Sequence, residues 1–374
     1  MSATTLEATP RPAKRRVLRG LPWVTWRQHR VALIGALLVL GGIGAFLIVD
    51  GLAMHHAFRQ FGLTSCGNLF TDACQVQLDL FRQHYRGTVD SLPQFLTLLP
   101  GLLGAFVGGP LVARELESGT YRFAWTQGRS RVRWIIVKLV ILAAVLTALA
   151  FGFSVLFTWW YGPWLTIAGR MNPGQAYEVS GLVFAARTLF AFMLGALAGT
   201  LIRRTVPAMA ATAAAWLAVV LPSMLWLRHL IEKPISLLAA TGAERTPIAI
   251  ELANPNSISI GTSAPHGAWE IARWTQDAAG HHLTSSEIFA LLQKADVNLG
   301  PPAGGLAHAG ATRAPAPGIS SFSTWLSQHG YRLGVSYQPA GRFWHFQGVE
   351  AAAYVLLALL CAAATIWWIR RRAA

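Results

Sequence analysis

The chain alternates long apolar runs with shorter polar connections. Six of these runs reach the roughly 20 residues that an α-helix needs to cross the hydrocarbon core of a bilayer. Backbone polar groups in lipid must be hydrogen-bonded within their own segment, so each run is predicted to be a transmembrane helix. The six runs cover residues 31–49, 94–113, 135–158, 182–202, 206–227 and 349–369.

Composition agrees with this pattern, and the distribution of charge adds an orientation. The 374 residues are 53% hydrophobic and only 13% charged, which is typical of an integral membrane protein. A formal net charge of +15 in a soluble chain would indicate nucleic-acid binding. Here more than half of the 31 Lys and Arg residues gather in four clusters. The clusters are the arm that ends at Arg30, the segment 113–138, the pair Arg203-Arg204, and Arg370–Arg372.

All four basic clusters fall on one side of the membrane if the six spans alternate in direction. The positive-inside rule then places this side, with both termini, in the cytoplasm of a multi-pass plasma-membrane protein. The charge is therefore an orientation signal, and no nucleic-acid partner is predicted. The first run has 19 residues and no small-residue cleavage site after Asp50, so it is predicted to be a retained span.

These spans divide the chain into four parts. Residues 1–30 form a cytoplasmic arm, whose residues 21–30 mix Trp with Arg and His; they suggest a short interfacial helix or, alternatively, an aromatic anchor for the first span. Helices 1–5 occupy residues 31–227, and residues 349–374 contain the sixth helix and a basic tail. The predicted fold class is an all-α polytopic membrane protein with an extracytoplasmic loop domain, residues 228–348, between helices 5 and 6.

Two helices are predicted within the segment 228–348. Thr284 and Glu287 have the spacing of a capping box at a helix N-terminus. A second helix is predicted around Ser321–His329 and should end at Gly330. The sequence between these helices is rich in Gly, Pro and Ala at 300–318 and has little capacity to pack.

The three cysteines lie in two places. Cys66 and Cys74 are in the first predicted outer connection, where an exported disulfide is plausible and reduced, solvated thiols are the alternative. Cys361 lies alone in the last span and is interpreted as a small packing residue.

Motifs for catalysis and for metal binding are absent from the sequence. It contains no phosphate-binding P-loop, no H-E-x-x-H metal motif and no G-x-S-x-G nucleophile elbow, so neither catalytic residues nor a metal site are predicted. The spans themselves carry few polar groups, and the main exception is Arg187 near the outer end of the fourth. Arg187 is interpreted as a structural residue that snorkels or pairs with Glu178, or alternatively as a contact for a substrate in the pathway.

The segment 113–138 is dense in charges that lipid cannot accommodate, so it is predicted to be an aqueous hairpin between the second and third helices. Gly119 is suited to end the incoming helix, and Thr120 to start a short transverse helix that carries Trp125. Ser130 then caps the third span. A rigid element of this kind can transmit the movement of a docked partner into the bundle.

At these residues the chain resembles permease subunits of ABC exporters of the type 2 class. In that family the loop after the second span has the pattern R-E-x-E-x-G-T, a short apolar stretch, then P-x-S-R and a Lys. Gly128 replaces the proline of many members, which puts the stiffness of the loop in question. The matching positions are Arg114, Glu115, Glu117, Gly119, Thr120, Ser130, Arg131 and Lys138.

The resemblance extends to six spans, cytoplasmic termini and an interfacial helix before the first span. Three further elements are similar to an actinobacterial branch: Trp23 with Trp26–Arg30, Trp125–Gln127, and R-F-W-H-F-Q-x-x-E at 342–350. The match covers most of the membrane part and little of 228–330.

The resemblance implies that the loop 113–134 is a coupling helix on which a separate ABC ATPase subunit docks. It also implies a second permease subunit, identical or paralogous, and ATP bound by the partner, so no cofactor is expected on this chain. The alternative for single residues is that Glu115 and Glu117 pair with neighbouring arginines in a solvated loop. The predicted docking residues are Arg114, Glu115, Glu117, Gly119, Thr120, Trp125, Ser130 and Arg131.

The leading functional hypothesis is therefore a permease subunit of an ATP-driven transporter, with export as the expected direction. The alternative is a membrane-anchored binding or sensor protein without transport activity, whose working part is the large segment 228–348.

Overall fold

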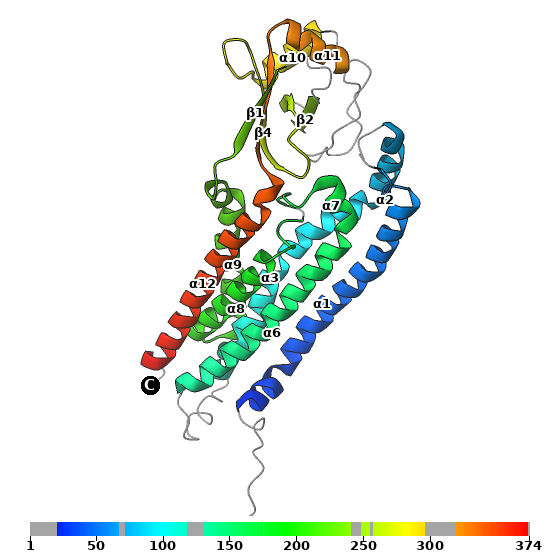
Figure 1. Cartoon of the computed structure of the whole chain (residues 1–374). Helices are drawn as coiled ribbons and strands as arrows, with labels where there is room; N and C mark the ends of the chain where they lie inside the picture. Colours follow the sequence, from blue (N-terminus) through cyan, green and yellow to red (C-terminus); the bar gives the residue numbers. More distant parts are fainter. Residues whose placement is uncertain are drawn as a thin grey trace, which may run out of the picture.

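The fold consists of a bundle of long helices with a smaller domain of strands and short helices at one end (Figure 1). The computed structural model describes residues 21–66, 72–117, 131–174, 176–240, 248–254, 257–295 and 319–372. Six helical segments within these residues are long and apolar enough to cross a membrane, as predicted. They are Ile34–Gln60, Cys74–Glu117, Val132–Trp160, Val183–Ile202, Thr205–Leu225 and Ala340–Arg371.

The first two helices extend beyond the apolar runs. Helix α1 covers Leu21–Gln60, and its 40 residues span about 60 Å at 1.5 Å per residue. Residues 21–30 continue into this helix instead of forming a separate interfacial helix, because Pro22 lies in the first turn, where proline is tolerated, and neither Pro nor Gly follows it before the first span. Helix α2 (Asp72–Thr97) runs back beside α1 and turns most of the polar connection into a helical hairpin.

The second span is interrupted by short changes of helix type. After α2 come α3 (Leu99–Leu103), a π-helical turn at Gly104–Gly108, and α4 (Gly109–Glu117). The π turn packs against α8 (Val183–Ile202), where the glycines of both segments allow backbone contact. A Cβ atom at Gly104 would overlap the backbone of Ala191, and one at Gly195 would overlap the Gly104 carbonyl. The two small-xxx-small pairs, which begin at Gly104 and Gly195, therefore face each other.

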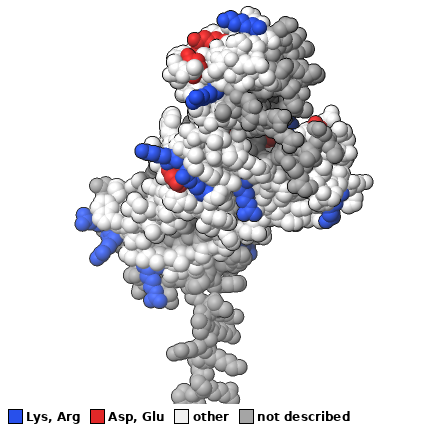
Figure 2. Space-filling view, turned by 45° about the horizontal axis from the view of Figure 1, so that its top comes forward, with Lys and Arg blue, Asp and Glu red and all other residues white. Residues whose placement is uncertain are grey.

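Helix α8 occupies the centre of the bundle. It packs against α4, α6 (Arg131–Trp160), α9 (Thr205–Leu225) and α12 (Phe343–Arg372). In the apolar stretch of α8, 67% of the residues are buried, whereas in the apolar stretches of α9 and α12 only 22% are buried. Helices α9 and α12 thus expose broad apolar faces, as expected for helices that contact lipid. In the view of Figure 2, most of the described surface belongs to residues other than Lys, Arg, Asp and Glu. Three short helices complete the connections: α7 (Gly162–Ala168) and the 3-10 turns η2 (Leu227–Leu230) and η3 (Ala340–Arg342).

The domain between α9 and α12, here called the sheet domain, contains two antiparallel sheets. In the larger sheet β5 is central, with β1 and β4 on its two sides, and β2 pairs with β3 in the smaller one. Gly334 of β5 lies beneath the indole of Trp274, which leaves no room for a side chain there. The strands are β1 (Ile235–Ala240), β2 (Ile248–Asn254), β3 (Ser257–Thr262), β4 (Trp269–Gln276) and β5 (Arg332–Gln338).

The sheet domain has a hydrophobic core of its own, built between its strands and two helices. Both helices, α10 (Ser285–Lys294) and α11 (Ile319–Gln328), lie where the sequence predicts them. The capping box of Thr284 and Glu287 is confirmed at the start of α10. The strands were not predicted. The core residues are Ile258, Ile260, Ile288, Leu291, Leu292, Phe322, Leu326 and Leu333.

Candidate functional site

One candidate site lies at the end of the bundle opposite the sheet domain, called here the basic end, where α4 ends and α6 begins on the two sides of the segment predicted to be a charged hairpin. Glu115 on α4 contacts the ammonium of Lys138 on α6. The Lys138 side chain is buried, and its Nζ lies 4.2 Å from the centroid of the Trp134 ring. Burying a charged lysine is costly unless an opposite charge compensates it, and Glu115 provides this compensation across the bases of the two helices.

The second glutamate of the hairpin motif contacts a third helix. Glu117 Oε2 accepts hydrogen bonds from the backbone N–H and the hydroxyl of Thr205, at 3.0 and 2.7 Å. Thr205 is the first residue of α9, so the carboxylate satisfies an N–H group that the helix leaves unpaired and lies at the positive end of its dipole. The turn that presents Thr205 contains Arg203 in a left-handed conformation, with φ of 59°.

Among the described residues, Glu115 contacts Lys138 and Glu117 contacts Thr205. Arg122 and Arg129 lie outside the described residues, so the alternative that the glutamates pair with neighbouring arginines stays a prediction. Each contacts a residue of another helix, so the base of the hairpin connects α4 with both α6 and α9. Arg114 is exposed, and Arg131 is the first residue of α6. The other predicted docking residues, Gly119, Thr120, Trp125 and Ser130, lie outside the described residues.

A buried network of four charges lies at the opposite end of the bundle, beneath the sheet domain; it is called here the charge network. Arg187 on α8 donates to Glu350 on α12 at 2.6 Å. Arg228 on η2 donates to Glu178 at 2.8 Å and to Glu350 at 3.3 Å. The exposed fractions are 0% for Glu178, 1% for both arginines and 5% for Glu350. Two positive and two negative charges make the network formally neutral, which burial of ions requires.

Glu350 is the central acceptor of this network. It accepts hydrogen bonds from both arginines, from the Tyr177 hydroxyl at 3.0 Å and from Ser223 at 3.5 Å. These donors come from α8, η2, the segment before α8 and α9. One carboxylate thus connects three long helices and a loop at the same level of the bundle.

Electrostatics and packing around Arg228 support its charged state. Its guanidinium lies 4.2 Å from the centroid of the Tyr177 ring. Burial opposes the charge of Arg228, but Glu178 and Glu350 outweigh it, so the pKa of Arg228 is raised. Burial also raises the pKa of the Tyr177 hydroxyl, and the negative charge of Glu350 raises it further. Tyr177 is therefore a neutral donor to Glu350 at physiological pH.

A neutral side chain completes this end of the bundle. Gln347 Oε1 accepts hydrogen bonds from the N–H groups of Leu182 and Val183, each at 2.9 Å, and its amide donates to the Tyr177 carbonyl. Gln347 on α12 thus caps the first turn of α8, which has no side-chain cap of its own.

The sequence identified Arg187 as the outstanding polar residue of the fourth span and left three interpretations: snorkelling, pairing with Glu178, or contact with a substrate. In the structure Arg187 is buried and pairs with Glu350, while Glu178 contacts Arg228, so the partner Glu178 was wrong. Sequence reasoning missed Glu350 and Arg228 because each lies at the edge of an apolar run, where a charge usually reaches the interface. The available signal was that two Arg and two Glu residues occur at the same end of the predicted spans.

The two remaining predicted residues lie at the tip of the α1–α2 hairpin, at the sheet-domain end. Cys66 and Cys74 form a disulfide in the structure, with their Cα atoms 6.4 Å apart. The bond closes the chain between α1 and α2 and limits the separation of their ends.

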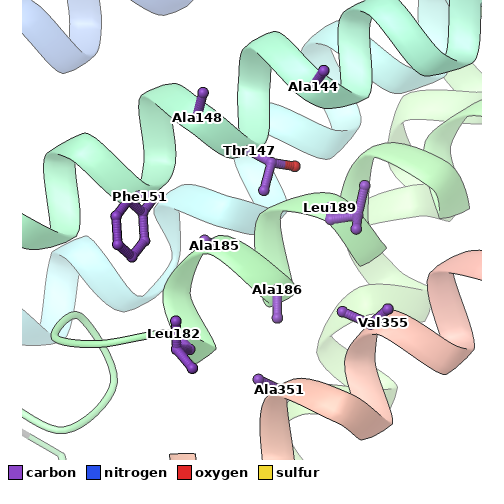
Figure 3. Close-up of a pocket in the computed structure, with 10 residues that line it drawn as sticks. All are labelled: Ala144, Thr147, Ala148, Phe151, Leu182, Ala185, Ala186, Leu189, Ala351 and Val355. Atoms are coloured by element: carbon purple, nitrogen blue, oxygen red, sulfur yellow. The ribbon is translucent and has the colours of Figure 1, made fainter. Parts of the chain in front are cut away.

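An apolar groove of about 560 Å³ runs between α6, α8 and α12 (Figure 3). Five alanines, with Phe151 and Val355, form much of its wall. All but one of its ten lining residues lie within three candidate membrane spans, so the groove is suited to hydrocarbon chains or other apolar molecules. The alanines are Ala144, Ala148, Ala185, Ala186 and Ala351.

Within the described parts of the chain, no three His, Cys, Asp or Glu side chains lie close enough to hold a metal ion. The interactions at these sites are ion pairs and packing contacts between helices. A family model described as "ABC-2 membrane transporter related" matches residues 36–228, just over half of the chain. Comparison with curated proteins and with solved structures found no match.

Proposed function

We infer that this chain, which belongs to the family of ABC-2-related membrane transporters, is a permease subunit driven by a separate ABC ATPase. The main observation behind this proposal is the family match, which covers five of the six spans, from the first helix through α9. The permease forms the membrane pathway and has no catalytic residue or cofactor of its own, because the partner binds and hydrolyses ATP. The expected direction of transport is export, and a second permease subunit, identical or paralogous, completes the pathway.

The basic end faces the cytoplasm in this proposal. The clusters around Arg114, Arg203 and Arg370–Arg372 support this orientation through the positive-inside rule. The sheet domain then lies outside the cell. The Cys66–Cys74 disulfide supports the same orientation, because disulfides persist in oxidising compartments.

The ATPase docks on the hairpin between α4 and α6, and the geometry at its base supports a route for coupling. The Glu115–Lys138 pair joins the two helices of the hairpin. Glu117 extends the connection to the N-terminus of α9 through Thr205. A force on the hairpin would therefore act on three helices together instead of bending one loop.

The docking proposal is tested by purifying the chain with an ABC ATPase encoded beside it and measuring complex formation and ATP hydrolysis. Trp125→Ala and Glu117→Ala should each weaken binding or uncouple hydrolysis at least about tenfold, a loss of about 1.4 kcal/mol. Trp344→Ala and Glu287→Ala are matched controls, because both residues are exposed at the sheet-domain end. Unchanged docking and unchanged coupled hydrolysis in both hairpin variants would reject the coupling assignment.

The alternative, a membrane-anchored binding or sensor protein, is favoured by one observation: the sheet domain has a closed core of its own. On that reading the chain functions without an ATPase partner. Transport assays in vesicles containing the purified complex separate the two, because substrate accumulation that requires ATP is incompatible with a sensor alone.

A further inference from the structure

The sheet domain joins the bundle through two paired chain segments, or legs: residues 226–234 after α9 and residues 338–342 before α12. Arg342 contacts Glu232 at 2.6 Å and donates to the Lys233 carbonyl at 3.0 Å. Gln338 donates to the Glu232 carbonyl at 2.7 Å. The legs continue directly into β1 and β5, which pair with each other, so the domain and its legs form one connected unit.

An apolar cluster, called here the seal, fills the space between this unit and the bundle. Met171, Tyr177, Phe343 and Phe346 are buried in it, and Trp269 from β4 packs against them. The Trp269 and Phe346 rings meet edge to face, with centroids 6.3 Å apart. Trp269 therefore comes from the sheet domain, whereas the other main members of the seal belong to the bundle and the legs.

A second contact between the sheet domain and the bundle is made by backbone atoms alone. Gly169 follows α7, and Gly267 precedes β4 in the sheet domain. Both residues have positive φ, and a Cβ atom at Gly169 would overlap the Cα atom of Gly267. The two backbones therefore approach each other as closely as only glycine allows.

The seal and the charge network share residues. Tyr177 packs in the seal and donates its hydroxyl to Glu350. Phe346 lies one helical turn before Glu350 on α12, so the same helix face carries both. Ion pairs weaken steeply when water reaches them, and Glu350 is only 5% exposed.

We propose that the sheet domain is a lid whose docking keeps the charge network dry and thereby holds the ends of α8, α9 and α12 together. Lifting the domain would withdraw Trp269, admit water to Glu350 and its arginines, and let these helix ends separate. Only the docked and the lifted positions of the domain are favourable, because a partly hydrated seal exposes apolar groups to water and leaves the buried charges poorly compensated. Its role in transport rests on the proposed permease function, but the coupling between domain and network is a property of the chain alone.

The coupling is tested by hydrogen exchange on the purified full-length chain, without an ATPase. In Gly169→Ala the added methyl separates the domain from the bundle, and amides of 183–189 and 345–352 should exchange at least about tenfold faster. Gly280→Ala is the matched control, since Gly280 also has positive φ but has no atom within 4 Å of the added methyl. Amides of β4 and β5 should stay protected in both variants, which shows that the domain itself remains folded.

A second variant covers the case in which Gly169→Ala does not fold. Trp269→Ala removes the contribution of the domain to the seal and should accelerate exchange of the same two segments. Because coupling between sites is reciprocal, Glu350→Gln should in turn accelerate exchange at 265–270, where the domain contacts the bundle. The proposal is overturned if the network segments keep wild-type exchange in the folded domain variants, or if Glu350→Gln leaves 265–270 unchanged.

Discussion

Single side chains decide the stability of the charge network, because a buried ion without a partner costs more than the pair contributes. Arg187 and Glu350 form one such pair, and Arg228 and Glu178 form another. Removing one arginine leaves an unbalanced negative charge, whereas removing a whole pair leaves the remainder neutral.

Arg187→Met should therefore destabilise the folded protein by about 3–5 kcal/mol, in the range measured for broken buried ion pairs. The double variant Arg187→Met, Glu350→Leu should lose less than Arg187→Met alone, since Arg228 keeps Glu178 as its partner. Denaturant-induced unfolding of the purified protein in detergent measures both. Arg170→Met, at an exposed arginine near the same end, should change the unfolding free energy by no more than about 0.5 kcal/mol.

Glu117 has a residue-scale role that differs from docking. It caps α9 through Thr205, so Glu117→Ala should loosen the first turn of α9 and cost about 1 kcal/mol. Faster amide exchange at 205–209, measured in the permease without an ATPase, is the expected result. Thr212→Val offers a comparison within α9, because the Thr212 hydroxyl donates to the carbonyl of Ala208 in its own helix. Equal exchange at 205–209 in Glu117→Ala and wild type would mean that the carboxylate does not cap the helix.

At the scale of elements, the glycines of α8 and the π turn determine how closely two helices pack. Gly195 lies against the backbone of Gly104 and Gly109. Neither helix can yield here without moving the other, because the neighbouring atoms are backbone atoms.

Gly195→Ala should therefore destabilise the protein by about 1–3 kcal/mol through overpacking. Gly152→Ala, on α6, should be neutral or stabilising by up to about 1 kcal/mol, because a methyl group there meets no atom within 4 Å and reduces the freedom of the unfolded chain. Thermal unfolding of the two variants in parallel provides the measurement. A Gly195→Ala variant as stable as Gly152→Ala would contradict the close helix contact.

The helices of the sheet domain were predictable and its strands were not, for a physical reason. The capping box is a local hydrogen-bond pattern that two residues, Thr284 and Glu287, encode. The strand β5, by contrast, depends on partners far away in sequence: Val335 pairs with Leu237, and Gly334 lies opposite Trp274. Short strands of this kind carry little periodicity of their own.

For the whole molecule, the proposed orientation makes a direct prediction. In a background with Cys361→Ala, where Cys66 and Cys74 are bonded to each other, the free cysteine introduced by Gly128→Cys should react with a membrane-impermeant thiol reagent only from the cytoplasmic side. Ala279→Cys, at an exposed position of the sheet domain, should react only from outside. Labelling of intact cells and of inside-out vesicles compares the two sides, and modification of position 128 only from outside would overturn the orientation.

The sequence by itself determined the number of spans, the helices of the sheet domain and a charged connection between α4 and α6, because hydrophobic length, capping and charge are local properties. It also identified Glu115, Glu117 and Arg187 as residues of interest. Only the tertiary structure decided that Glu115 contacts Lys138, that Glu117 caps α9, and that Arg187 pairs with Glu350. The partner of a buried charge depends on which helices become neighbours, and that choice is made by packing across the whole bundle.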